Sequence, residues 1–309
     1  MKHKRALVTG GAGFIGSHLS ERLLAEGLEV VVLDNLSVGK RANVPRSAEL
    51  VVGDVREKDG TAAALAGVDV VFHLAARVSI RASVAGFYED GETNVMGTLN
   101  LLRACAAQNV DRFVYASSMA VYADASTDKP IAEDHATVPI SPYGVAKLAC
   151  ERYVMLVAAQ SGFDAVALRY FNTYGPRQTF TPYVGVITIF IQRLLRGEPP
   201  VIFGDGEQCR DFVHVGDIVD ATVRAMDCQE CNGVLNIGSG QGTTVNQVAQ
   251  LLCSRLKPDI SPEHAPPQPG ELRSSVADIR RAKQLLGYEP HGQLAERIDE
   301  VIAWNRSLA

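Results

Sequence analysis

The sequence predicts an α/β protein: a doubly wound parallel sheet of the Rossmann type, followed by a smaller mixed α/β domain. Three observations lead to this fold class. Short apolar segments alternate with helical patterns through the first half of the chain. These segments are apolar throughout, as strands buried on both faces are. A glycine-rich turn joins the first strand to the first helix, and 309 residues suffice for one large domain or two closely packed ones.

Taken in order, the expected strands are short apolar runs that cover residues 5–9, 29–34, 49–54, 68–75, 112–117 and 164–169. Apolar residues at helical spacing predict helices over 14–25, 93–108 and 141–162. Gly27 comes shortly after the first helix, and glycine commonly ends helices. Because the strands are apolar on both sides, helices should cover both faces of the sheet.

Charge and composition exclude several classes of function. The chain carries 30 basic and 35 acidic residues, a net charge of −5, so it lacks the basic surface that binds a nucleic acid polymer. The same charge disfavours anionic membranes, no apolar run approaches a membrane span, and no signal-peptide core follows the first residues. We therefore expect a cytoplasmic protein in which local donors hold any anionic ligand.

The six cysteines are expected to be reduced thiols, because disulfides are rare in the cytosol. Only Cys228 and Cys231 have the C-x-x-C spacing of a metal or redox site. No second pair stands at ligand spacing, and the surrounding stretch is rich in Asp, Gln and Glu. The sequence therefore predicts a solvated helix end there and no metal site.

The residues from Thr9 to Gly16, Thr-Gly-Gly-Ala-Gly-Phe-Ile-Gly, follow the first strand directly and open the first helix. In that position glycines allow a tight turn and close backbone approach, and the amino end of the helix binds a pyrophosphate. Asp34 ends the second strand, where a carboxylate accepts hydrogen bonds from the adenosine ribose and repels a 2′-phosphate. The expected cofactor is therefore NAD rather than NADP.

Two further strand ends complete the expected cofactor site. Asp54 is placed to bond the adenine amino group, and the small residues after Leu74 leave room for the nicotinamide half. The candidate cofactor-binding residues are Gly10, Gly13, Phe14, Ile15, Gly16, Asp34, Asn35, Asp54, Val55, Leu74, Ala75, Ala76, Tyr143, Lys147 and Tyr170.

The domain boundary is expected after Tyr174, because Gly-Pro and Pro-Pro pairs then interrupt the chain and prolines cluster further on. We assign residues 1–174 to the NAD-binding Rossmann domain, with returns to its sheet near 212–226 and 234–237. Residues 175–309 are assigned to a discontinuous substrate-binding domain.

Tyr143 and Lys147 form a Y-x-x-x-K motif early in the helix that follows Ser141-Pro142. Residues four apart lie on one face of a helix, so the ammonium lies near the phenol and lowers its pKa. The phenolate is then a general base near neutral pH. Ser118, at the carboxyl end of the fifth strand, is expected to share the hydrogen bond of the substrate hydroxyl. Ser118, Tyr143 and Lys147 are the candidate catalytic residues.

With these motifs the chain resembles, over essentially its whole length, the extended short-chain dehydrogenases/reductases of the NAD-dependent nucleotide-sugar epimerase/dehydratase group. It is most similar to the UDP-glucose (UDP-galactose) 4-epimerases, through Arg169-Tyr-Phe-Asn-Thr-Tyr-Gly-Pro-Arg177 and Ile202-Phe-Gly-Asp-Gly-Glu-Gln-Cys-Arg-Asp-Phe-Val-His214. The resemblance implies that Tyr143 takes the proton of the C4 hydroxyl while hydride passes from C4 to NAD. Hydride then returns to the opposite face of the 4-keto sugar, with no net redox change.

The resemblance also assigns the substrate site. Its candidate residues are Ser118, Asn172, Val201, Phe203, Arg210, Arg273 and Ser275. Arg210 would pair with the diphosphate, and Val201 and Phe203 would flank the uracil. Ser275 stands where a bulky Tyr would exclude an acetamide, which favours tolerance of N-acetylated sugars. Gln268 stands where many relatives have a diphosphate-binding Arg, so Arg273 is the possible replacement.

Several departures separate the alternatives within the group. Dehydratases of the group have acidic residues where this chain has Met119 and Ala120, and UDP-glucuronate decarboxylases have Glu at the Ala120 position. No base follows Arg177 closely, which favours a neutral hexose over a uronate. A UDP-glucuronate 4-epimerase or decarboxylase and another nucleotide-sugar 4-ketoreductase remain alternatives, and a non-catalytic NAD-binding module would be expected to lack the Ser/Tyr/Lys set. The resemblance implies a homodimer through the helices near 93–108 and 142–161.

Overall fold

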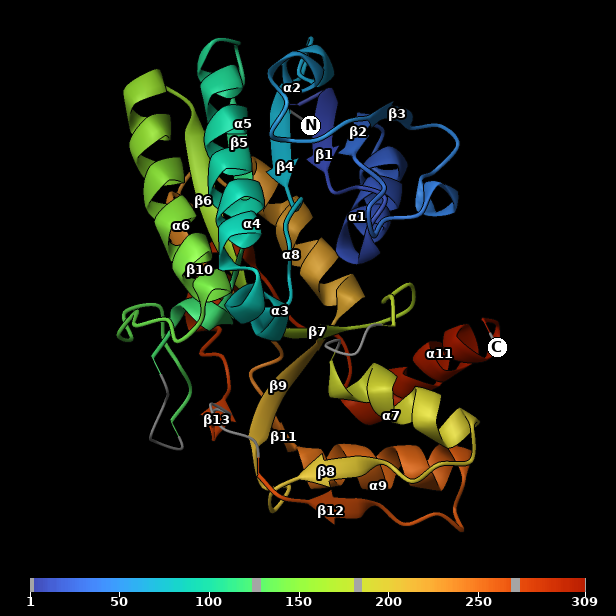
Figure 1. Cartoon of the computed structure of the whole chain (residues 1–309). Helices are drawn as coiled ribbons and strands as arrows, with labels where there is room; N and C mark the ends of the chain where they lie inside the picture. The colour runs from blue at the N-terminus through green and yellow to red at the C-terminus, as the bar shows by residue number, and fades with distance from the viewer. Residues whose placement is uncertain (1–2, 124–128, 181–184, 268–272, 309) are drawn as a thin grey trace.

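A computed structural model describes residues 3–123, 129–180, 185–267 and 273–308 of the chain. Its largest element is a seven-stranded parallel sheet in the order β10-β6-β5-β4-β1-β2-β3 (Figure 1). The strands are β1 (Arg5–Thr9), β2 (Glu29–Asp34), β3 (Glu49–Val52), β4 (Val70–His73), β5 (Arg112–Ser118), β6 (Asp164–Tyr170) and β10 (Gly233–Ile237). The strand order reverses beside β1, which in such sheets opens a crevice at the carboxyl ends of the strands.

Helices cover both faces of this sheet, because the inner strands carry buried apolar residues on both sides. The helices are α1 (Phe14–Ala25) and α8 (Val215–Asp227) on one face, and α2 (Lys58–Ala64), α5 (Gly97–Ala106) and α6 (Pro142–Ser161) on the other. Along β1, Ala6 and Val8 belong to the first core and Leu7 to the second. The predicted Rossmann-type fold is confirmed.

The expected helix over 93–108 has a different form. Two short helices precede it, α3 (Ile80–Ala85) and α4 (Phe87–Gly91), and a π-helical turn, η2 (Glu92–Met96), leads into α5. Such wide turns are rare and often occur at functional sites. Two single 3-10 turns, η1 (Arg41–Asn43) and η3 (Met119–Val121), follow β2 and β5.

The smaller part of the molecule lies beyond the carboxyl ends of the strands, in the lower half of Figure 1. Strands β11 (Gly242–Thr244), β9 (Cys209–His214), β13 (Ser274–Ser275) and β7 (Asn172–Tyr174) form one sheet, and β8 (Val201–Phe203) and β12 (Glu263–Ala265) form another. A separate apolar core joins them to α7 (Val186–Leu195), α9 (Val245–Leu256) and α11 (Leu294–Arg306). α10 (Arg280–Leu286) packs back against α8 and β10.

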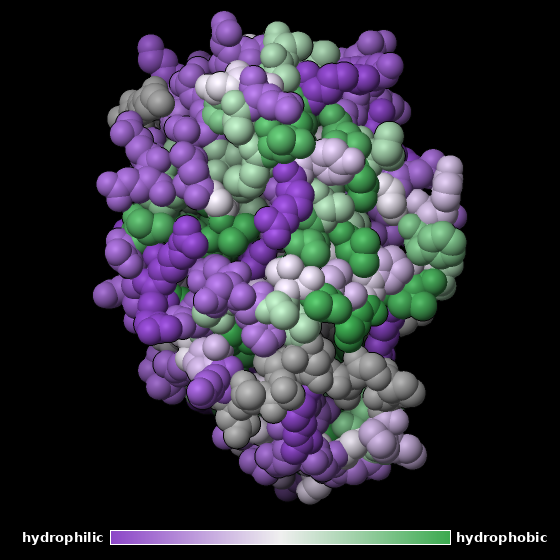
Figure 2. Space-filling view, turned by 90° about the vertical axis from the view of Figure 1, so that its left-hand side faces the viewer, coloured by the Kyte–Doolittle hydropathy of each residue, from purple (hydrophilic) through white to green (hydrophobic). Residues whose placement is uncertain are grey.

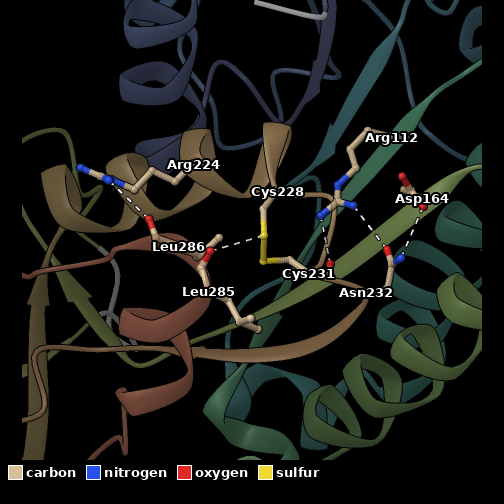
Figure 3. Close-up of a disulfide and its surroundings, with 8 residues drawn as sticks. All are labelled: Arg112, Asp164, Arg224, Cys228, Cys231, Asn232, Leu285 and Leu286. Carbon is tan, nitrogen blue, oxygen red and sulfur yellow. Dashed lines mark hydrogen bonds between the residues drawn. A yellow bond between two sulfur atoms is a disulfide. The ribbon is translucent and has the colours of Figure 1, made fainter.

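The expectation of reduced cysteines is wrong for one pair, because Cys228 and Cys231 are joined by a disulfide. The chain turns back after α8, and the amide of Cys231 donates to the carbonyl of Cys228 at 3.4 Å. This turn brings the two Cα atoms to 5.4 Å, within the range that a disulfide requires. Figure 3 shows the buried Arg112 donating to the Cys231 carbonyl at 3.0 Å, which fixes the loop from the other side.

Candidate active site

The amino end of α1 meets the glycine-rich turn at the centre of the sheet edge. Gly10 has a φ of +72°, and a β-carbon there would lie 2.8 Å from the amide nitrogen of Ala75. A β-carbon on Gly16 would overlap the carbonyl oxygen of Gly10. No side chain caps α1, and its first turn holds no acidic residue. The turn therefore keeps its backbone close to β4 and leaves an electropositive helix end, which fits the pyrophosphate of a dinucleotide.

The residues expected on the adenosine side are close together. Asp34 is buried, and its two carboxylate oxygens accept the backbone amides of Ala12 and Leu36 at 3.0 and 2.8 Å. Asn35 donates to Asp54 at 2.9 Å. A hydrogen-bonded Arg56 lowers the pKa of Asp54 to about 2, so this carboxyl is ionised at neutral pH.

The segment after β4 is held by a chain of buried hydrogen bonds centred on His73. Thr98 donates to the Asn94 carbonyl at 2.6 Å, and this uses the only proton of its hydroxyl. His73 Nε2 must then donate to Thr98 (2.9 Å), and Nδ1 accepts from Thr9 (2.7 Å). The Thr9 hydroxyl in turn accepts the amide of Ala75 at 3.2 Å. Burial lowers the pKa of His73 to about 3, which keeps the imidazole neutral in this chain.

Asn94, in the π-helical turn, holds the same segment from the other side. Its side chain accepts from the amide of Arg77 at 2.8 Å and donates to the carbonyl of Arg77 at 3.0 Å. Its carbonyl also accepts from Cys150 of α6 at 3.2 Å. The expected nicotinamide wall, Leu74 to Ala76, therefore rests on β1, α5 and α6 together.

The three candidate catalytic residues come together where β5 ends against the first turns of α6. Ser118 hydrogen-bonds Tyr143, and this bond opposes the rise in the Tyr143 pKa that burial causes, to about 12 in the protein alone. Lys147 donates to the Ala116 carbonyl at 2.7 Å, and its Nζ lies 5.8 Å from the centroid of the Tyr143 ring. Burial lowers the pKa of Lys147 to about 8. The cluster thus holds an amine and a phenol whose protonation depends on nearby charge.

Local capping explains why α6 begins at this point. Ser141 accepts the amide of Gly144 at 3.1 Å as the N-cap, and Pro142 occupies the first helical position. Gly144 allows this end of α6 to touch the backbone of Ala120, just after Ser118. Tyr143 is therefore held by both helix capping and close packing.

Asp90 of α4 is a neighbour of this cluster that the sequence patterns did not single out. The residue is 1 % exposed, and a hydrogen bond from the Asn94 side chain opposes the rise in its pKa. Its charge raises the pKa of both Tyr143 and Lys147, and burial raises the pKa of Asp90 itself. The sequence offers no signal that separates Asp90 from its acidic neighbours Glu89 and Glu92, and only the packing of α4 against α6 selects it.

The candidate substrate residues lie on the strands of the smaller part. Val201 and Phe203 are half-buried on β8, on either side of the buried Ile202. On β7, Asn172 donates to the carbonyl of Asp211 at 3.3 Å. Arg210 is half-buried on β9 and donates to the carbonyl of Cys209 at 2.9 Å.

Three of the expected site residues have side chains that are buried or bonded elsewhere. Ser275 pairs with Arg210 in register but is fully buried, so its side chain does not line an open pocket here. Arg273 has an exposed side chain in an ion pair with Asp205 at 2.9 Å. The Tyr170 side chain lies in the core beside α8, where its hydroxyl meets that of Thr222 at 2.7 Å. Gln268 lies outside the described residues.

The described part of the chain holds neither a metal-binding cluster nor a membrane-spanning helix. It contains no cluster of three or more His, Cys, Asp or Glu side chains that could hold a metal ion. Among its helices, none is both long and apolar enough to cross a membrane.

Comparison with known proteins decides the family. The model of the NAD dependent epimerase/dehydratase family matches residues 6–238. The chain belongs to this family. Its cofactor is therefore NAD, as the glycine-rich turn and Asp34 predict, and it is an enzyme of the UDP-sugar epimerase group.

Three relatives illustrate the likeness. A putative UDP-glucose 4-epimerase of Methanocaldococcus jannaschii is 39 % identical over 97 % of this chain and 98 % of its own. The UDP-glucose 4-epimerase of Thermotoga maritima, solved with UDP-glucose, is 40 % identical over 98 % of this chain and 99 % of its own, with a TM-score of 0.94. The UDP-N-acetylglucosamine 4-epimerase of Methanobrevibacter ruminantium is 36 % identical over the whole of both chains, also with a TM-score of 0.94. These relatives act on different sugars, so the family leaves the substrate open.

Proposed function

We propose that this family member is a UDP-hexose 4-epimerase that interconverts UDP-glucose and UDP-galactose and also accepts the N-acetylated pair. The observation that carries the proposal is the cluster of Ser118, Tyr143 and Lys147 at the end of β5, in a chain similar throughout to 4-epimerases. Tolerance of the acetamide is proposed from the residue type alone, because the small Ser275 stands where a bulky Tyr would exclude it, and the burial of Ser275 lends this part no support.

In this proposal Tyr143 is the general base and later the general acid at the C4 oxygen. Its phenolate is favoured by the hydrogen bond from Ser118. We assign a second contribution to the ammonium of Lys147, whose Nζ lies 5.8 Å from the centroid of the Tyr143 ring. Ser118 also orients the C4 hydroxyl towards Tyr143. When bound, NAD would supply reversible hydride transfer at C4. The cofactor would be held by the end of α1, Asp34 and the Leu74–Ala76 segment.

Arg210 is proposed to hold the diphosphate. An acidic protein needs a local cation for a dianionic ligand, and a guanidinium binds phosphate oxygens in a fork. Arg210→Gln should raise the KM for the UDP-sugar about 10-fold or more, as loss of a charged hydrogen bond does, with a smaller change in kcat. Arg273→Gln is the matched variant. If it had the larger effect, Arg273 would be the diphosphate ligand and Arg210 would not.

The substrate is tested with a panel. Purified protein is incubated without added NAD with UDP-glucose, UDP-N-acetylglucosamine or UDP-glucuronate, and the C4 epimers are separated by chromatography. UDP-galactose from the first and the N-acetylated epimer from the second are expected. Recovery of every substrate unchanged would reject the proposal, and release of carbon dioxide or net consumption of NADH would favour the decarboxylase or ketoreductase alternative. Tyr143→Phe should abolish turnover while NAD stays bound.

We also propose a homodimer through α6 and the helices beside it. Figure 2 shows apolar side chains gathered on the face that α5 and α6 present. Large apolar residues at least 42 % exposed on α3, α4, η2 and α6 include Ile80, Val84, Phe87, Tyr88, Met96, Val145, Tyr153 and Leu156. Large exposed apolar patches usually mark interfaces, and two copies would bury this one. Light scattering should give the mass of a dimer, and Leu156→Glu should give a monomer.

A further inference from the structure

A buried ion pair lies directly behind the proposed catalytic cluster. Arg169 of β6 donates to both carboxylate oxygens of Glu151 of α6, from Nη2 at 2.7 Å and from Nε at 2.8 Å. Their side chains are 3 % and 2 % exposed. This two-point geometry fixes the direction of both side chains, which a single contact does not do.

The pair connects α6 to the end of β5. Ser117, the residue before Ser118, donates from its hydroxyl to Glu151 at 2.5 Å. One helical turn earlier on α6, Lys147 donates to the carbonyl of Ala116 at 2.7 Å. Two successive turns of the helix are thus bonded to two successive residues of the strand. Such a double attachment sets both the rotation of α6 and its position along its own axis.

The same arginine reaches the segment on the other side of Ser118. Arg169 Nη1 donates to the Tyr122 hydroxyl at 2.8 Å, and this hydroxyl donates to Asn236 of β10 at 2.6 Å. The guanidinium also lies 4.7 Å from the centroid of the Tyr122 ring. Ser118 is therefore flanked by two residues, Ser117 and Tyr122, that are bonded to one rigid buried pair.

Burial of an ion pair is costly in desolvation and is weak evidence for a gain in stability over an apolar pair. It does impose a definite geometry on the elements that it joins. We propose that Glu151 and Arg169 are positioning residues, which hold Tyr143 and Lys147 of α6 in register with Ser118. This inference rests on the proposed function. Tyr143, Lys147 and Glu151 are spaced four residues apart and therefore lie on one face of α6. The first two are the proposed catalytic residues, and Glu151 lies one turn further along.

Ser117→Ala is the first test, because it releases the strand from Glu151 and leaves the ion pair intact. A misplacement near 1 Å lowers catalysis about 100-fold, so kcat should fall by roughly 10- to 100-fold. The KM for the UDP-sugar and the retention of NAD should change less than kcat, because most residues expected to bind either ligand lie away from the α6–β5 contact. Ser117→Thr keeps the hydroxyl and should restore most of the kcat.

Tyr288→Phe is the matched control, since it also removes one buried hydroxyl, which donates to the carbonyl of Gly238 at 2.8 Å. It should leave kcat unchanged. A wild-type kcat in Ser117→Ala, or an equal loss in Tyr288→Phe, would overturn the proposal. Glu151→Gln, which keeps an oxygen acceptor but removes the charge, should lower kcat further if it folds. If it does not fold, Ser117→Ala still decides.

A separate measurement distinguishes failure of the positioning role from failure of the proposed function. If the wild-type protein turned over no UDP-sugar, the proposed function would fall. Positioning would then be judged by amide hydrogen exchange over residues 142–151. Exchange there should be faster in Ser117→Ala than in Tyr288→Phe at equal global stability. Equal exchange in the two variants would reject the role of Glu151 and Arg169.

Discussion

Replacing Gly144 by Ala should separate the catalytic residues without removing any of them. A β-carbon at this position would overlap the carbonyl oxygen of Ala120 and lie 2.9 Å from the β-carbon of Pro139. Backbone atoms cannot swing away as a flexible side chain can, so the amino end of α6 must move by about 1 Å to restore normal contacts. Tyr143 is the adjacent residue and moves with it, away from Ser118.

The expected loss follows from that displacement. A shift near 1 Å in reacting groups costs about 100-fold in rate, so kcat for UDP-glucose epimerisation should fall by about two orders of magnitude. Gly91→Ala is the control, since a β-carbon there meets nothing within 4 Å. Epimer formation is followed at saturating substrate, and circular dichroism checks the fold. A Gly144→Ala enzyme with wild-type kcat would refute the tight packing of Tyr143 against the β5 end.

Three further predictions follow from the charges and close contacts of the site. Asp90→Asn removes a charge that raises the pKa of both Tyr143 and Lys147, so both limbs of the pH–rate profile should move to lower pH; the exposed Glu89→Gln should move neither. The folded pKa of His73 is about 3, below the unfolded value of 6.5, so the unfolded chain binds the extra proton first and stability is lost as pH falls below 6.5. Between pH 6 and 5, His73 should lower the free energy of unfolding of the wild-type protein by up to about 1.4 kcal/mol per pH unit. This contribution should be missing in His73→Asn when unfolding by urea is measured at both pH values. Gly16→Ala should abolish NAD retention, read as the absorbance at 260 nm relative to 280 nm, and a fully loaded variant would contradict the close packing of the glycine turn.

Much of the nucleotide-binding half could be predicted from residue patterns alone. The first strand, the first helix and the second strand begin and end at the expected residues, because apolar runs, a glycine turn and helix-ending signals are local features. The π-helical turn at Glu92–Met96 could not be foreseen in the same way. Its hydrogen bonds to Arg77 and Cys150 join segments that are distant in the chain.

The cysteines show the same limit. The C-x-x-C spacing of Cys228 and Cys231 is that of a metal or redox site, and the expected cytosolic location favoured reduced thiols. The turn after α8, fixed by the guanidinium of Arg112 from β5, brings the two residues together. The spacing of the two cysteines permits a disulfide. The loop that forms it is held by a hydrogen bond from Arg112, which lies 119 residues earlier in the chain than Cys231.

By itself, the sequence determined the fold class, the NAD-binding turn and the residue types of the proposed catalytic set, because each depends on local spacing or on the chemistry of single side chains. Tertiary structure decided how those residues are held. The neutral state of His73, the buried charge of Asp90 and the attachment of Glu151 to Ser117 and Arg169 arise only when distant strands and helices meet. Desolvation and long-range hydrogen bonds set these properties, and neither can be read along a single stretch of chain.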